Sequence, residues 1–255
     1  MSRSRADWLE VVRESMEETW ALMAESTEGG RVVRRDGLVA AVVPLTPERS
    51  VSNSVVYSDR DVLLASIEEL ARVYADAGVR AWTVWVPEHD EEAGPALEAA
   101  GHLLDASPRA MGMDLSRVER PDLVGIDWAR GCDLDTVGRI NDDAYGYDHP
   151  GGLRTIITGM PADRVHSYGA SVDGEVAAVM MTIDFGSDTE LVWVATREAT
   201  RGRGLATALL RQALWDARER GQATSTLQAT SRGAPVYARV GYEDLGALDM
   251  WERRL

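Results

Sequence analysis

The sequence predicts an α/β (α+β) fold of two similar halves, each a mixed, mostly antiparallel, twisted sheet flanked by helices. Strand-like and helix-like hydrophobic patterns alternate through all 255 residues. The same order of elements repeats after a polar stretch at residues 116–122. The segments 95–102 and 235–242 also share the same spacing between a proline and a glycine. We therefore predict two domains, residues 1–118 and 119–255, that arose by tandem duplication.

The first half begins with a helix, because apolar side chains recur along one side of residues 7–23. A turn signal at Asp36-Gly37 divides a strand pair within residues 31–43. Gly78 ends a second helix. The remaining elements expected in this half are strands at residues 51–56, 81–86 and 103–115 and helices at residues 63–77 and 95–100.

The second half repeats this order. An Asp173-Gly174 turn joins a hairpin. Gly221 ends a helix at residues 205–220. This helix has an apolar stripe at i, i+4 spacing, which consists of Leu205, Leu209, Ala213 and Ala217 together with Leu210 and Leu214. The expected elements are strands at residues 124–128, 165–172, 176–184, 191–195, 224–230 and 242–251 and helices at residues 134–145, 205–220 and 234–240.

The chain is strongly acidic, with 42 Asp and Glu against 27 basic residues and a net charge of −15. Such a surface repels nucleic-acid phosphates, so we expect no nucleic-acid partner. It also favours the approach of amine-bearing substrates, although the same charge fits a solvated acidic surface that keeps the protein soluble. Every basic residue is arginine. The absence of lysine excludes a Schiff-base lysine and a P-loop lysine.

Metal and membrane sites are not expected either. The four histidines lack the spacing of a metal site, and the single cysteine, Cys132, cannot form an internal disulfide. No apolar stretch approaches the roughly 18 residues of a membrane helix, and the first residues do not form a secretory signal. We expect a cytoplasmic protein with no membrane partner.

The most informative stretch is a glycine-rich turn that leads into the helix at residues 205–220. Gly202 and Gly204 let a ligand approach the N–H groups at the start of that helix, which form a site for anions. Arg201 and Arg203 add positive charge. Taken alone, the stretch also fits an ordinary helix start. A Rossmann dinucleotide loop fits less well, because no acid ends the next strand.

Four features follow one another in the second half. They are the strand ending at Thr196, the Q/R-x-x-G-x-G/A pattern that begins at Arg201, the next strand, and the Tyr237-x-x-x-Gly-Tyr segment. Through these features, residues from about 124 to 255 resemble a GNAT N-acetyltransferase domain. The resemblance implies acetyl-CoA as co-substrate and no metal. The residues that it places on acetyl-CoA are Val194, Ala195, Thr196, Arg201, Gly202, Arg203, Gly204, Leu205, Ala206, Thr207 and Thr230.

The resemblance assigns separate parts of acetyl-CoA to these residues. Backbone groups of residues 194–196 would hold the acetyl carbonyl and the pantetheine arm. Backbone N–H groups of residues 202–207 would hold the pyrophosphate. Thr230 stands where many relatives carry asparagine.

The resemblance also implies that an amine attacks the thioester directly and that Tyr237 is the general acid for the CoA thiolate. A tyrosine with a pKa near ~10 is protonated at neutral pH, although Tyr237 also fits a core tyrosine. For the general base we nominate Glu190, with Asp184 as second choice, and each also fits a strand-end charge that faces solvent. The segment where relatives contact substrate, which also fits a plain surface loop, contains Tyr145, Tyr147 and His149.

The first half lacks this chemistry at the matching positions. When helix ends are matched, Asp59-Arg60-Asp61 lies opposite the glycine turn, and Leu97 lies opposite Tyr237. Carboxylates repel phosphate, and leucine cannot donate a proton. We hypothesise that the first half kept the fold, lost the chemistry and has a structural role.

The predicted function is acetyl-CoA-dependent transfer of an acetyl group to a primary amine of a small molecule or peptide. Exposed apolar strands could also pair between two copies of the chain, so a homodimer is possible. The alternative is a non-catalytic acetyl-CoA-binding sensor or interaction protein. A nucleotide-dependent α/β enzyme is a more distant alternative.

Overall fold

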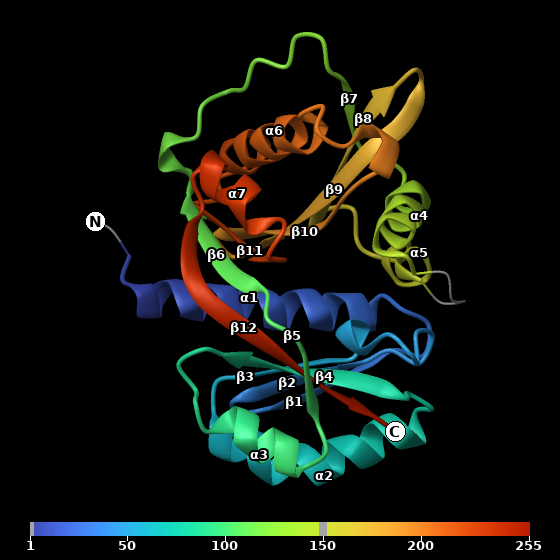
Figure 1. Cartoon of the computed structure of the whole chain (residues 1–255), viewed down its shortest axis with the longest axis vertical. Coiled ribbons are helices and arrows are strands. Elements are labelled where there is room, and N and C mark those ends of the chain that lie inside the picture. The colour runs from blue at the N-terminus through green and yellow to red at the C-terminus, as the bar shows by residue number, and fades with distance from the viewer. Residues whose placement is uncertain (1–2, 148–151) are drawn as a thin grey trace. The chain divides into compact units, whose positions relative to one another are not determined.

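The computed structural model describes residues 3–147 and 152–255, which form two compact units (Figure 1). The first unit contains the residues up to 111 and residues 228–234 and 244–255, and the second contains residues 112–227 and 235–243. Each unit holds a mostly antiparallel sheet flanked by helices, as predicted. Each unit is made of separate stretches of the chain, whereas each predicted domain is one continuous stretch. The units therefore do not test the predicted boundary at residue 118, which stays a prediction.

The first unit has a sheet with helices on both faces. Its elements are α1 (Arg5–Glu25), β1 (Arg31–Arg35), β2 (Leu38–Val42), η1 (Ser50–Ser52), β3 (Ser54–Tyr57), α2 (Arg60–Asp76), β4 (Ala81–Pro87), α3 (Ala93–Ala99), β5 (Leu103–Ala106) and β12 (Glu243–Arg254). The strand order is β1-β2-β3-β4-β12, and β5 also pairs with β12. Helix α1 covers one face, and α2 and α3 cover the other (Figure 1).

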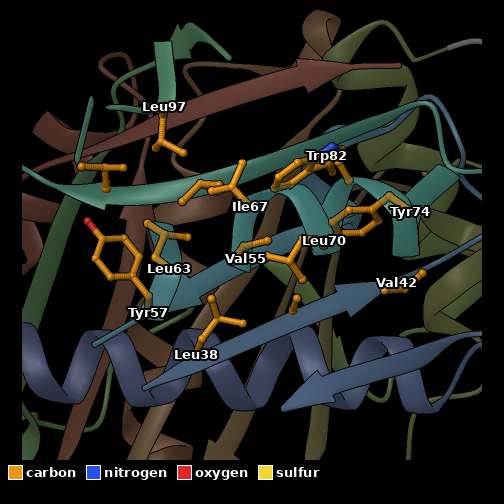
Figure 2. Close-up of a cluster of buried hydrophobic side chains, with 14 of the residues drawn as sticks. Leu38, Val42, Val55, Tyr57, Leu63, Ile67, Leu70, Tyr74, Trp82 and Leu97 are labelled. Atoms are coloured by element: carbon orange, nitrogen blue, oxygen red, sulfur yellow. The ribbon is translucent and has the colours of Figure 1, made fainter. Parts of the chain in front are cut away.

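The core of the first unit lies between its sheet and helices α2 and α3 (Figure 2). Alternate residues of β2, including Leu38 and Val42, point into it, as expected for the period of two in a strand. Ile67 and Leu70 of α2 meet them from the helical stripe. The amphipathic pattern of the sequence therefore predicts this helix and its buried side correctly.

The second unit repeats the arrangement. Its elements are β7 (Asp127–Arg130), α4 (Leu134–Tyr145), α5 (Leu153–Ile157), β8 (Val165–Val172), β9 (Glu175–Phe185), β10 (Asp188–Thr196), η3 (Glu198–Thr200) and α6 (Leu205–Glu219), with η2 (Leu115–Arg117) before them. Three further elements have residues in both units: β6 (Arg109–Asp114), β11 (Thr224–Ala229) and α7 (Ala234–Val240). Strand β12 also begins in the second unit, with Glu243. The strand order is β11-β10-β9-β8-β7, with α6 on one face of the sheet and α4 and α5 on the other (Figure 1).

Each unit contains a parallel strand pair whose strands are joined through a long helix. Strands β3 and β4 are joined through α2, and their register ends at Val55 and Val84. Strands β10 and β11 are joined through α6, and their register ends at Glu190 and Thr226. The two halves therefore share the arrangement that a tandem duplication predicts.

Several elements differ from the sequence prediction. The expected strand at residues 51–56 begins as the helical turn η1, because the buried Asn53 side chain accepts from Val43 N–H at 2.7 Å and holds the chain in a tight turn. The expected strand at residues 103–115 is divided into β5 and β6 near Pro108, which has no N–H to donate. No helix in the described residues is long and apolar enough to span a bilayer.

Candidate active site

The candidate site lies in the second unit, at the end of β10 and the start of α6, beyond the last residues of β10 that pair with β11. Their shared register ends at Glu190 and Thr226, although β10 continues to Thr196 and β11 to Ala229. The facing edges of these last residues therefore do not bond to each other. The edge of β10 beyond this point therefore carries backbone N–H and C=O groups that a ligand can use.

A β-bulge distorts β10 in the same stretch. Its pairing with β9 shifts register between Val192 and Ala195, and Trp193 has a φ of +50°. This left-handed conformation costs a bulky residue roughly 1–2 kcal/mol, and such strain concentrates at functional sites. The bulge contains Val194 and is followed by Thr196, so it falls on the residues predicted to hold the acyl end of acetyl-CoA. Nothing in the sequence indicates it, since tryptophan does not favour this backbone conformation.

The glycine turn before α6 leaves backbone donors free of side-chain caps. Gly202 and Gly204 both have a φ of +78°, which glycine adopts without strain. A Cβ atom on either residue would meet no atom within 4 Å. Gly204 is the N-cap of α6, and no side chain of the described residues caps this helix. Its first-turn N–H groups are therefore suited to an anion.

Two arginines flank these donors. Arg201 and Arg203 are exposed, and Arg201 Nε donates to the Thr196 carbonyl at 3.2 Å, which ties the turn to the end of β10. Leu205 is buried at the helix start, whereas Ala206 and Thr207 are half-buried. The helix itself is fixed by the predicted apolar stripe, which consists of Leu205, Leu209, Leu210, Ala213, Leu214 and Ala217, all buried.

Tyr237 lies on α7 and is half-buried. Its ring packs edge-on against Tyr242, with centroids 5.9 Å apart, and the Tyr242 hydroxyl lies 2.7 Å from Ser225 Oγ on β11. Burial raises the pKa of Tyr237, and the phenol of Tyr145 acts in the same direction. The Tyr237 hydroxyl therefore stays protonated throughout the neutral range, as a proton donor requires.

Glu190 is buried within β10, with only 1% of its surface exposed. The expectation of a strand-end charge that faces solvent is therefore wrong for this residue, because β10 begins at Asp188 and not at residue 191. Asp188, two residues earlier on the same strand, is also buried and accepts a hydrogen bond from the Thr226 hydroxyl at 2.7 Å. Two buried carboxyl groups thus lie just before the point where β10 and β11 separate.

Asp184 is committed to structural contacts. Its carboxylate accepts from Thr189 Oγ1 at 2.6 Å and from Arg220 Nε at 2.7 Å, and His166 Nε2 lies 3.3 Å away. Burial alone would raise the pKa of Asp184, but the hydrogen bonds from His166 and Arg220 hold it well below its usual range. A carboxylate stabilised in this way is a poor proton acceptor, so Glu190 is the better candidate for a base.

Other predicted site residues have more local surroundings. The hydroxyl of Thr230 is exposed and accepts from Gly233 N–H at 3.2 Å, in the turn before α7. Its contact with acetyl-CoA stays a prediction. Tyr145 ends α4 and is 60% exposed, and Tyr147 follows it. His149 lies outside the described residues.

The first unit differs at the corresponding positions. Asp59 caps α2, because its Oδ1 accepts from the N–H groups of Asp61 at 2.9 Å and Val62 at 3.1 Å. Asp59 and Gly204 are both N-caps, so they occupy the same position in the two helices. Matching the C-terminal ends of the helices instead places Asp59 opposite Gly202, because α2 has 17 residues and α6 has 15. Leu97 is fully buried in the core (Figure 2). An anion would find these helix donors already occupied by a carboxylate.

The residues of the second unit fit acetyl-CoA. The space around Gly202 and Gly204 is free of side chains, so a pyrophosphate can approach the backbone of the turn. The uncapped start of α6 offers it backbone N–H groups. The distorted strand edge suits an extended arm that carries amides. Among the described residues, no group of three His, Cys, Asp or Glu side chains is placed to hold a metal ion.

Residues 161–244 match a family model described as an acetyltransferase (GNAT) domain. The matched range includes β10, the glycine turn, α6 and Tyr237. No curated protein matches the chain.

Several solved structures with the same fold are GNAT proteins. A GCN5-related N-acetyltransferase from Kribbella flavida has a TM-score of 0.68 at 16% identity, with 95% of each chain covered. One from Sphaerobacter thermophilus has a TM-score of 0.60 at 18% identity, with 86% of this chain and 81% of its own covered. A tandem GNAT protein from the clavulanic acid biosynthesis pathway has a TM-score of 0.59 at 16% identity, with 88% and 81% covered. The predicted GNAT fold and its tandem form are thereby confirmed.

Proposed function

Because the chain carries a GNAT acetyltransferase domain at residues 161–244, we propose that it transfers the acetyl group of acetyl-CoA to a primary amine of a small molecule or peptide. The observation that carries this proposal is the glycine turn before α6. Its bare backbone and uncapped helix start support a pyrophosphate site, and Arg201 and Arg203 add positive charge there.

The proposed binding mode assigns the backbone N–H groups of residues 202–207 to the pyrophosphate. Backbone groups of residues 194–196, at the bulge of β10, bind the pantetheine arm and the acetyl carbonyl. The divergence of β10 from β11 supports this assignment, because a strand edge without a ladder partner can bond an extended ligand. Thr230 is an additional proposed contact.

In the proposed reaction, the amine nitrogen attacks the thioester carbonyl carbon. A C–N bond forms and the C–S bond breaks, and the departing thiolate takes the proton of Tyr237. A thiol of this kind has a pKa near ~8.5, so the donated proton lowers a modest barrier. Glu190 takes the proton that the amine loses, either directly or through water. Its burial beside the diverging strands supports this role.

The acceptor is proposed to be cationic before it loses its proton. The net charge of −15 favours the approach of amines over anions and nucleic acids. Tyr145, whose phenol influences the pKa of Tyr237, is proposed to lie along the path of the acceptor.

Release of free thiol from acetyl-CoA in the presence of an amine panel tests the activity. Amine-dependent thiol release, with the acetylated amine as the second product, is expected. Binding of acetyl-CoA without thiol release for any amine would instead support a non-catalytic sensor. That alternative is favoured by one observation, the local hydrogen bond of Thr230 where many relatives carry asparagine.

Self-association is a separate proposal. The β5 strand exposes Leu103 and Leu104, with 72% and 51% of their surfaces accessible, so it offers an apolar edge for a homodimer. Size-exclusion chromatography with light scattering tests this. A Leu103→Lys change should shift a dimer to monomer.

A further inference from the structure

A cavity of about 780 Å³ opens in the first unit, which otherwise has no assigned activity. It lies where β3 and β4 separate, and it is lined by the ends of both strands, including Val56, Tyr57 and Trp85. Helix α1 forms the opposite wall with Leu9 and Met16. Its volume is in the range of small-molecule sites, which reach about 300–1,000 Å³.

The position of this cavity follows from the duplication. The register of the parallel pair ends at Val55 and Val84 in the first unit and at Glu190 and Thr226 in the second. The first half has therefore kept a space at the place where the second half has its candidate site. Most of the wall is apolar, and Trp85 presents its ring while its N–H is bonded to Ser54 Oγ at 2.8 Å.

The arginines that line the cavity are already neutralised. Each forms an ion pair with a carboxylate of the first unit: Arg5 with Glu88 at 3.3 Å, Arg13 with Glu17 at 2.6 Å, and Arg60 with Asp90 at 2.9 Å. The start of α2 is capped by Asp59. An anionic ligand, including a CoA phosphate, therefore meets paired guanidinium groups and occupied helix donors.

Three carboxylates and three arginines line the cavity, and further carboxylates pair with these arginines from outside it. Glu10, Glu88 and Asp90 line it with the three arginines, and Glu14, Glu17 and Glu92 pair with the same arginines from outside. The side chain of Asp90 is only 10% exposed and accepts from Tyr57 Oη at 2.8 Å. Burial alone would raise the pKa of Asp90, but the hydrogen bonds from Arg60 and Tyr57 lower it, so it is ionised at neutral pH. The local charge favours a cation.

We propose that this cavity is a second binding site of the protein, for an amine with a compact aromatic or aliphatic body. The body packs between Trp85 and the apolar side of α1, and the protonated amine points toward Glu88 and Asp90. This site does not depend on the catalytic proposal for the second unit.

Calorimetry with the full chain tests the proposal with two probes of similar size and opposite charge, 2-phenylethylamine and 3-phenylpropionate. The amine should bind saturably and at least tenfold more tightly than the carboxylate. Absence of saturable amine binding, or equal binding of both probes, would overturn the proposal. Competition between free CoA and the amine would also overturn it, because the cavity would then be a retained cofactor site.

Two variants locate the binding. Ala6→Trp places an indole at the cavity and should weaken amine binding at least tenfold, whereas Ala75→Trp, on the exposed side of α2 and away from the cavity, should change it less than twofold. Unchanged affinity in Ala6→Trp would contradict the assignment. Glu88→Gln supplies an independent check, since it should weaken 2-phenylethylamine several-fold and leave the neutral 2-phenylethanol unaffected. Equal loss for both ligands would also contradict it.

Discussion

Tyr237 has the most specific chemical role in this account. The residue is half-buried, its hydroxyl is protonated at neutral pH, and it lies in the same compact unit as the glycine turn. Tyr237→Phe should lower turnover by about 10²–10⁴-fold, the usual contribution of general acid–base catalysis, with little change in acetyl-CoA affinity. Steady-state thiol release and calorimetry measure the two quantities. Tyr168→Phe, on β8 of the same unit, is the matched control and should retain turnover within about threefold.

Asp184 provides a prediction about stability. Asp184→Asn weakens the contacts with Arg220 and Thr189 and should lower the free energy of unfolding by about 2 kcal/mol at pH 7, the scale of hydrogen bonds to charged groups. The lowered pKa of Asp184 means that its stabilisation is present above its unfolded pKa near ~3.9 and is lost as pH falls below that value. Urea unfolding between pH 3 and pH 7 measures it. A difference between the two proteins that stays constant down to pH 3 would contradict the assignment.

The residues of the candidate site were predictable to different degrees. The glycine turn could be predicted from local sequence, because the spacing of its small residues carries the signal. The role of Tyr237 is implied by the resemblance to GNAT domains and stays a prediction. The burial of Glu190 and the strained backbone of Trp193 depend on how β10 pairs with its neighbours. Such long-range pairing leaves no mark on the residues themselves, so neither feature could be predicted.

At the scale of elements, the starts of α2 and α6 differ in whether a side chain caps the helix. Asp59 closes α2 with its own carboxylate, whereas Gly204 leaves α6 without a side-chain cap. Asp59→Ala should therefore lower the free energy of unfolding by about 0.5–2 kcal/mol, the usual effect of losing an N-cap. Chemical denaturation measures this. Asp59→Asn should keep nearly full stability, because asparagine caps equally well, and a loss as large as that of alanine would argue against capping.

Helices were predicted more accurately than strands. The apolar residues of α2 and α6 recur with a period of about 3.6 residues, so the sequence alone predicts both helices and their buried faces. The turn at η1 depends on the hydrogen bond of the Asn53 side chain to Val43 N–H, and the division between β5 and β6 lies near Pro108. The alternation of apolar and polar residues does not predict either feature. The five residues of α5 are too few to show a period.

At the scale of the whole molecule, the C-terminal strand belongs to the first unit although it ends the second half of the sequence. β12 pairs antiparallel with β4 from Leu248 to Arg254. Deleting residues 244–255 should therefore expose β4 and abolish cooperative unfolding of the first unit, whereas deleting Leu255 alone should leave the melting temperature within a few degrees. Circular dichroism during heating measures both. A shortened protein that still melts cooperatively at the temperature of the full chain would contradict the pairing.

The molecule contains two versions of one architecture. One has a bare, uncapped helix start next to a distorted strand edge, and the other has a capped helix beside an apolar cavity with acidic surroundings. We infer that the copies diverged in the ligand that they accept. Coenzyme A should therefore bind to one copy only.

Titration calorimetry with coenzyme A measures this most directly. The full chain should bind one molecule per chain, Gly204→Asp should weaken binding more than tenfold, and Gly204→Asn, which adds similar bulk without charge, should weaken it less. Asp61→Asn in the first unit should change nothing. No heat with the intact protein, two equal sites per chain, or unaltered affinity in Gly204→Asp would contradict the assignment of the glycine turn to the phosphates.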